Sequence, residues 1–159
     1  MKFSVLLILI LSSTVTFSQK TENSSLPSPS SQFLNTIELN SETSIEEYIT
    51  TYFSGEKQIT ILDSTNWDTD GKFRTCHIKT QYERVTIDKY NCEMFSTFNF
   101  VFKGYSKEEV ISIMKLLFVD TDNYFWEGDK YGTIEEGVGC LLSITQKETE
   151  TIVSYGCGC

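Results

Sequence analysis

Apolar and polar residues alternate along many short stretches of this chain, a pattern typical of strands with one buried face. The clearest case is residues 94–102, where Phe98, Phe100 and Phe102 fall on one side of an extended backbone. A strand with three phenylalanines on one side must be half buried. The other stretches that favour strands are residues 33–39, 59–62, 73–79, 85–90, 123–126, 137–145 and 149–155.

Residues 44–53 and 106–117 follow the helical period instead. Ser44 and Ser106 stand at the two starts, where a serine side chain can cap free backbone amides. Two glutamates follow each serine in the first turn, where the helix dipole favours negative charge. The predicted apolar stripes are Ile45, Tyr48, Ile49, Tyr52 and Phe53 in the first helix and Val110, Ile113, Met114 and Leu117 in the second.

Strands outnumber helices, and the helices are separated by runs of strands rather than by single strands. This order predicts an α+β fold, an antiparallel β-sheet with two helices on one face. Similar motifs recur in the same order, which predicts two βαβββ-like halves in tandem, residues 34–92 and 93–159. The alternative is the loose repetition that any α+β chain with similar turns shows.

The predicted layout is similar to that of tandem α+β inhibitors such as the β-lactamase inhibitory protein. The resemblance is one of element order, and no motif of the sequence carries it. It therefore implies a fold and no function.

The first 18 residues have the three parts of a secretory signal peptide, with Lys2, an apolar run over residues 3–11 and small residues before a cut after Ser18. The apolar run is too short for a spanning helix, which needs about 20 residues. Residues 19–33 contain both prolines and many serines, which predicts a flexible linker before a single α+β domain over residues 34–159. We expect a secreted or periplasmic protein that is not inserted in the membrane after cleavage.

The formal net charge of −9 argues against nucleic-acid binding, which requires basic patches. His77 is the only histidine, so a zinc site made of several histidines is excluded and a Ser-His-Asp triad would have to use it. Residues 66–71 begin like a calcium loop, but the twelfth position is His77 instead of a glutamate. We expect no metal and no cofactor, and the lack of a nucleophile motif favours a protein that is not an enzyme.

Five cysteines in an exported chain predict disulfides. If the last hairpin turns through residues 147–150, Cys140 lies directly opposite Cys157. Cys76 and Cys92 face each other in the same way if their hairpin is centred at residue 84. Two such staples are predicted, although spacing alone leaves the pairing open.

An odd number of cysteines leaves one over, and we expect it to be Cys159, free or bonded to a second chain in a dimer. Cys159 shares a strand face with Cys157, so either can be the partner of Cys140. The alternative interpretation is functional, because two thiolates separated only by Gly158 can exchange disulfides or bind a soft metal.

The stretch most typical of binding is residues 124–131, with three consecutive aromatic residues. They cannot all point inward from one strand, and an exposed ring beside carboxylates can stack on a carbohydrate or anchor a protein partner. The alternative is an edge strand covered by a neighbouring segment. We expect a small exported non-enzymatic module that binds, inhibits or has a structural role. The predicted binding residues are Tyr124, Phe125, Trp126, Asp129 and Tyr131.

Overall fold

A computed structural model describes residues 25–53, 55, 57–66, 73–92, 95–133 and 139–158, with backbone only at residues 63–66, 73–74, 92 and 95. The predicted signal peptide lies outside these residues. The elements in chain order are α1 (Ser31–Leu34), α2 (Glu42–Tyr52), β1 (Gln58–Asn66), β2 (Phe73–Gln81), β3 (Val85–Cys92), β4 (Phe95–Lys103), α3 (Lys107–Leu117), β5 (Tyr124–Glu127), β6 (Lys130–Thr133), β7 (Gly139–Lys147) and β8 (Glu150–Gly158).

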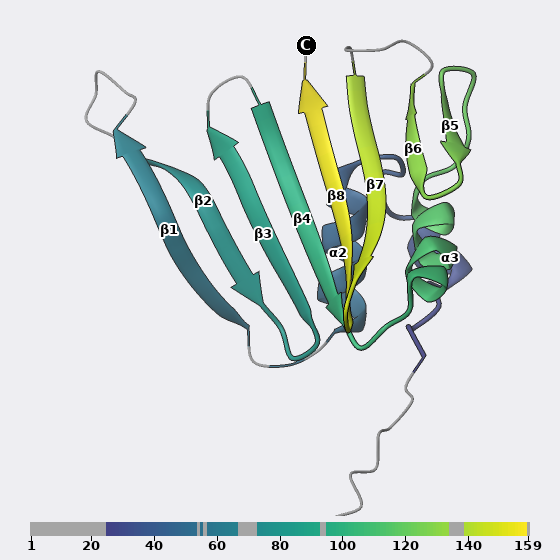
Figure 1. The fold of residues 1–159 in the computed structure, drawn as a ribbon, viewed down its shortest axis with the longest axis horizontal. Helices are drawn as coiled ribbons and strands as arrows, with labels where there is room; N and C mark the ends of the chain where they lie inside the picture. The colour runs from purple at the N-terminus through teal and green to yellow at the C-terminus, as the bar shows by residue number, and fades with distance from the viewer. Residues whose placement is uncertain are drawn as a thin grey trace, which may run out of the picture.

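The eight strands form one antiparallel sheet in the order β1-β2-β3-β4-β8-β7-β6-β5 (Figure 1). Two four-stranded meanders, β1 to β4 and β5 to β8, therefore meet where β4 pairs with β8. One helix precedes each meander, α2 before the first and α3 before the second. The predicted α+β fold dominated by an antiparallel sheet is confirmed.

The two longer helices begin at serine caps. Ser106 caps α3 as predicted, in a reciprocal capping box with Glu109. The cap of α2 is Ser41, so the prediction of Ser44 was wrong. Ser44 lies inside the helix, where its hydroxyl donates to the carbonyl of Ser41. Counted from Ser41 and Ser106, the two apolar stripes fall at the same positions.

Other expectations differ from the structure near the N-terminus. The strand predicted over residues 33–39 is α1 followed by turns, and no strand of the described chain precedes α2. The predicted linker is described from Ser25 onward and is packed against the fold. Leu26 is buried, and the carbonyl of Pro27 accepts a hydrogen bond from the Tyr48 hydroxyl at 2.7 Å.

The core lies on the face of the sheet that α2 packs against. Directly opposite residues of paired strands share a face, so the register defines rows that cross the sheet. One row is Ile61, Ile78, Lys89, Phe98, Tyr155, Leu142, Tyr131 and Trp126, with one residue from each strand. A parallel row is Ile59, Thr80, Ile87, Phe100, Val153 and Ile144.

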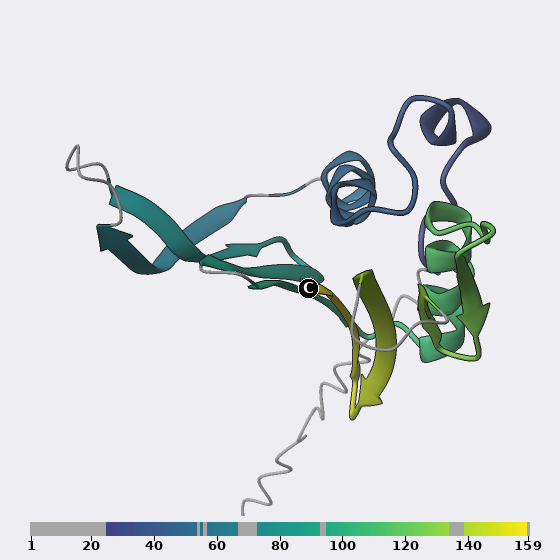
Figure 2. The same cartoon turned by 90° about the horizontal axis from the view of Figure 1, so that it is seen from above.

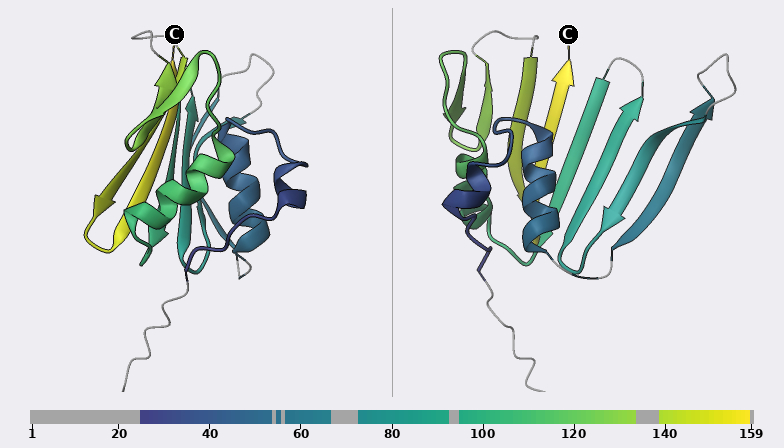
Figure 3. Two further views of the ribbon diagram at one scale, coloured as in Figure 1. Left: turned by 90° about the vertical axis from the view of Figure 1, so that its right-hand side faces the viewer. Right: turned by 180° about the vertical axis from the view of Figure 1, so that it is seen from behind.

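The two ends of the sheet are covered differently. Seen from above, the sheet bends around α3 at the end formed by β7, β6 and β5 (Figure 2). Seen from behind, α2 lies across the middle of the sheet, and β1 and β2 project beyond it (Figure 3). The first row is therefore buried from Phe98 to Tyr131 and the second from Ile87 to Ile144, whereas both rows are exposed at β1.

Candidate functional site: a tyrosine pocket beside a disulfide

The predicted binding stretch is divided by the alternation of β5. Tyr124 and Trp126 are half-buried, whereas Phe125 is exposed between them. The ring nitrogen Nε1 of Trp126 donates to the carbonyl of Phe118 at 2.7 Å, which gives this side chain a structural role. Asp129, in the turn after β5, forms an ion pair with Lys107. The rings of Tyr124 and Trp126 both contact that of Tyr131, whereas Phe125 points to the opposite face of the strand.

Tyr124 and Tyr131 do come together. Their rings stack with centroids 6.0 Å apart and planes inclined by 22°. Together they line a cavity of about 200 Å³ with Asn40, Cys140 and Tyr155. We call this cavity the tyrosine pocket. Tyr155 could have been found from the sequence, because it lies on the same strand face as Cys157.

Asn40 is the member of the pocket that no sequence pattern indicated. It has a left-handed backbone conformation, with φ of 62°, which asparagine adopts more readily than most residues. Its backbone amide donates to the carbonyl of Leu117, and its Oδ1 accepts from the amide of Val119 at 2.7 Å. These two bonds attach the loop before α2 to the end of α3, which closes one side of the pocket.

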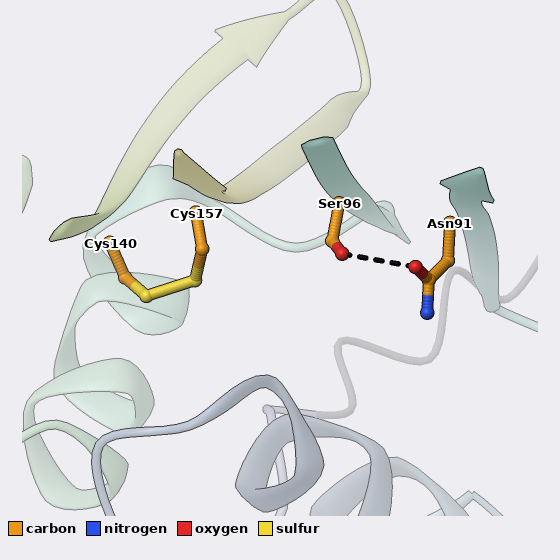
Figure 4. The surroundings of a disulfide bond; sticks show 4 residues. All are labelled: Asn91, Ser96, Cys140 and Cys157. Carbon is orange, nitrogen blue, oxygen red and sulfur yellow. Dashed lines mark hydrogen bonds between the residues drawn. A yellow bond between two sulfur atoms is a disulfide. The ribbon is translucent and has the colours of Figure 1, made fainter. Parts of the chain in front are cut away.

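The disulfide between Cys140 and Cys157 forms another wall of the pocket. Cys140 and Cys157 are directly opposite each other in the β7–β8 hairpin, which turns between Lys147 and Glu150 as predicted. Their Cα atoms are 4.0 Å apart. Figure 4 shows the bond that joins the two strands. The bridge thus fixes the ends of β7 and β8 at the pocket.

Gly139 lets the chain enter β7 close to the tyrosines. Its φ is +117°, a backbone conformation that residues with side chains rarely adopt. A Cβ atom at this position would lie 2.9 Å from the Tyr124 hydroxyl and 3.1 Å from Cγ2 of Thr133. A glycine is therefore required both by the backbone and by the packing.

The polar groups of the pocket are neutral hydrogen-bonding groups. The Tyr131 hydroxyl donates to the carbonyl of Val119 at 2.7 Å. Among the described residues, the hydroxyls of Tyr124 and Tyr155 and the Nδ2 group of Asn40 have no hydrogen-bond partner. Both hydroxyls can donate and accept, and the amide can donate twice. These groups are available to a ligand.

Burial favours the protonated form of Tyr155 and Tyr131. It raises the pKa of Tyr155 to about 12, and the nearby Glu42 adds to the increase. Burial also raises the pKa of Tyr131. The lining residues carry no charged side chain, so the pocket offers uncharged donors and acceptors across the neutral pH range.

The other candidate groups lie elsewhere. His77 contacts Asp88 on β2 and β3, with Nε2 and Oδ1 2.6 Å apart. Within the described ranges, no three acidic, histidine or cysteine residues are grouped so that they could hold a metal ion. Most of the acidic loop at residues 66–71, and Cys159, lie outside those ranges.

Cys76 is buried and disulfide-bonded. Its pairing with Cys92 stays a prediction, because the side chain of Cys92 is not among those described. The β2–β3 register runs from His77 opposite Tyr90 to Gln81 opposite Thr86, one residue away from the predicted register. The two cysteine hairpins also occupy different places in their meanders, β2–β3 in the first and β7–β8 in the second, so they are not equivalent.

Comparison with protein families, curated proteins and solved structures finds no match to this chain. None of the described helices is long and apolar enough to cross a membrane.

Proposed function

We propose that this chain is an exported binding module, without catalysis of its own, whose tyrosine pocket holds a neutral carbohydrate ring. The observation that carries the proposal is the lining of the pocket. It combines three tyrosine rings with the amide of Asn40, and it includes no charged side chain.

The absence of charge from the lining favours a neutral ligand. A buried charge without a partner is strongly unfavourable, so an anionic or cationic group would lose its hydration here and gain no counter-ion. A neutral ligand has no such penalty. Its hydroxyl groups can exchange water for the hydroxyls of Tyr124 and Tyr155 and the amide of Asn40.

The shape and size of the pocket favour a single ring. Aromatic side chains provide flat apolar faces with a polar edge, which match a sugar ring that has one apolar face and a rim of hydroxyls. A cavity of about 150 Å³ can hold a benzene ring, so the tyrosine pocket at about 200 Å³ has room for one sugar unit. A longer glycan would have to present a terminal unit.

The proposal also covers the finer arrangement of the fold and the location of the protein. We propose that α2 and α3 cover one face of the sheet. We also propose that the chain is duplicated, with a unit of one helix followed by four strands in place of the predicted βαβββ-like halves over residues 34–92 and 93–159. Support comes from the equal placement of the caps Ser41 and Ser106 and from the symmetric strand order. The Cys140–Cys157 disulfide supports export to an oxidising compartment, secreted or periplasmic.

The alternative function, thiol exchange or soft-metal binding by Cys157-Gly158-Cys159, has less support. It requires two available thiols, and the sulfur of Cys157 is bonded to that of Cys140. Alkylation of the native protein followed by peptide mapping separates the two proposals. Labelling of Cys157 without prior reduction would favour the alternative.

Saturation-transfer NMR tests the carbohydrate proposal with a panel of methyl glycosides and N-acetylglucosamine, and with glucuronate and glucosamine as charged probes. At least one neutral sugar should receive saturation, and the two charged probes should receive less. The variants Tyr124→Ala and Tyr155→Phe should lower the affinity at least ten-fold. Tyr90→Ala is the matched control, because Tyr90 is an exposed tyrosine outside the pocket.

The proposal fails if no neutral sugar binds, or if binding is equal in Tyr124→Ala and in the control. Far-UV circular dichroism of each variant shows that the fold is intact. The conservative Tyr155→Phe change keeps the buried ring, so its effect reports on the hydroxyl alone.

A further inference from the structure

The exposed end of the apolar face lies at β1 and β2. Ile61 is directly opposite Ile78, and both belong to the row that enters the core at Phe98 and Tyr155. Ile61 is 61% exposed and Ile59 is 57% exposed, although the residues that follow them in their rows are buried from β3 or β4 onward. We call the surface formed by Ile59, Ile61 and Ile78 the isoleucine shelf.

The shelf continues into a groove beside α2. This groove has a volume of about 330 Å³ and runs between the first turns of α2 and the strands β2, β3 and β4. Ile78, Lys89 and Phe98 line its floor, and Glu42 and Glu46 line its helical wall. Two apolar side chains beside an acidic wall give the groove an amphipathic surface.

The charge of the wall is only partly compensated. Glu46 forms an ion pair with Lys89, whose ammonium also lies 5.8 Å from the ring centroid of Phe98. Glu42 forms no ion pair with the described residues. One carboxylate of the wall is therefore available to a cation, in a chain whose formal net charge is −9.

We propose that the isoleucine shelf and this groove dock an amphipathic helix of another protein, with its apolar side on Ile59, Ile61 and Ile78 and a lysine or arginine beside Glu42. The helix would lie next to α2 and extend the layer of helices over the uncovered strands. Recognition would combine burial of the exposed isoleucines with one charge pair at the rim.

Charge complementarity selects this occupant over a second copy of the same chain. Two copies that met shelf to shelf would bring two acidic walls together, and like charges that face each other across an interface are unfavourable. A basic helix has the opposite effect. The site is separate from the tyrosine pocket, so this proposal does not depend on the proposed carbohydrate ligand.

Isothermal titration calorimetry tests the proposal with two synthetic helical peptides of the same leucine pattern, one with lysine and one with glutamate at every polar position. The lysine peptide should bind the wild-type chain, and the glutamate peptide should not. Ile61→Ser should weaken the lysine peptide at least ten-fold. The matched control is Leu141→Ser, because Leu141 is 53% exposed and lies outside the two apolar rows.

The charge pair has its own matched control. Glu42 and Glu108 both lie in the first turn of a helix, but only Glu42 lines the groove. Glu42→Gln should weaken the lysine peptide several-fold, and Glu108→Gln should leave it unchanged. If both glutamate variants lose the same affinity for the lysine peptide, the effect comes from the net charge of the chain, and the proposed site is overturned.

Three further results would overturn the proposal. The lysine peptide fails to bind, it binds Ile61→Ser as well as wild type, or the chain forms a concentration-dependent dimer that Ile61→Ser abolishes. Light scattering after size-exclusion chromatography identifies the dimer, which would assign the shelf to a second copy. Because the side chain of Ile61 is exposed, the Ile61→Ser variant should fold as the wild type does. A loss of peptide binding in this variant therefore reports on the surface and not on the fold.

Discussion

The two ends of the sheet carry the same apolar face and differ in what covers it. At β7 and β8 the row residues Leu142 and Tyr155 are buried, α3 packs against β7, and Tyr155 lines the pocket with Asn40 and Cys140. At β1 the row residue Ile61 is 61% exposed. A covered end can enclose a small pocket, and an uncovered end can only offer a surface. The position of the helices thus decides what kind of ligand each end can bind.

The largest expected effect on stability comes from a substitution in the buried part of the rows. Phe100 is fully buried in the middle of the sheet, so Phe100→Ala leaves a cavity and loses the burial of a ring. The free energy of unfolding should fall by about 3–5 kcal/mol. Urea denaturation followed by fluorescence measures the loss, and a change below 1 kcal/mol would contradict the packing described for the core.

Removal of the disulfide comes next and acts on the covered end alone. The bridge closes a loop with a sequence separation of 17, and a loop of this size contributes about 3 kcal/mol through the entropy of the unfolded chain. The double variant Cys140→Ser, Cys157→Ser should lose about this amount and should bind the carbohydrate probe more weakly. A reducing buffer should not lower the free energy of unfolding of this double variant any further through the Cys140–Cys157 bridge, because the bridge is already absent.

Gly139→Ala should break the entry to β7 at a cost of about 1–3 kcal/mol, because the backbone conformation is strained for alanine and its Cβ meets the Tyr124 hydroxyl. Gly128→Ala is the control, since Gly128 also has a positive φ but no atom within 4 Å of the added Cβ. Both positions have a positive φ, but the φ of 117° at Gly139 lies further from the left-handed helical region than the φ of 63° at Gly128. A larger loss in Gly139→Ala, measured by thermal unfolding, therefore reports the more strained backbone and the contact with the pocket together.

The covered end should also respond to alkaline pH. The pKa of Tyr155 is about 12 in the folded chain and about 10 in the unfolded chain, so its contribution is complete below pH 10 and is lost as the pH rises toward 12. The loss should be roughly 2–3 kcal/mol. Tyr155→Phe should flatten this part of the stability profile, and an unchanged profile would contradict the assignment to Tyr155.

The smallest effect is expected at the uncovered end. Ile61→Ser removes an exposed side chain, so the free energy of unfolding should change by less than about 0.5 kcal/mol. Urea denaturation with Phe100→Ala as the reference makes the contrast direct. A loss of more than 2 kcal/mol would mean that β1 is packed in solution and that the shelf is not free.

Sequence reasoning succeeded where the signal is local. The alternation in residues 94–102 predicted β4, and the serine cap and apolar stripe of residues 106–117 predicted α3. The β7–β8 hairpin was also predicted, because its turn residues fix which cysteines are opposite. In each case the pattern repeats over two or more turns or strand pairs within a short segment.

The failures come from short elements and from distant contacts. β6 covers only Lys130–Thr133, too few residues to show an alternation. Residues 33–39 alternate like a strand, but Phe33, Leu34 and Ile37 pack on the core from α1 and the turns after it. Asn40 is held at the pocket by a hydrogen bond to Val119, a residue that is far from it in the sequence.

The comparison also explains why only part of the candidate site was found. The aromatic stretch drew attention to Tyr124 and Tyr131, which do line the pocket. Tyr155 and Cys140, which also line the pocket, belong to the β7–β8 hairpin, where the sequence indicated only a disulfide. β6 joins this hairpin to the aromatic stretch, because Tyr131 pairs with Leu142. Because β6 was not predicted, the sequence did not indicate that Tyr124 and Tyr131 lie beside Tyr155 and Cys140.

Chemical-shift mapping tests the central claim most directly, because it locates the ligand on one end of the sheet. The measurement adds the methyl glycoside with the strongest saturation transfer to the ¹⁵N-labelled chain. The account predicts that the amides of Asn40, Tyr124, Gly139, Cys140 and Tyr155 shift and that those of residues 58–62 do not. Shifts confined to β1 and β2, or no localised shifts at any sugar concentration, would contradict it.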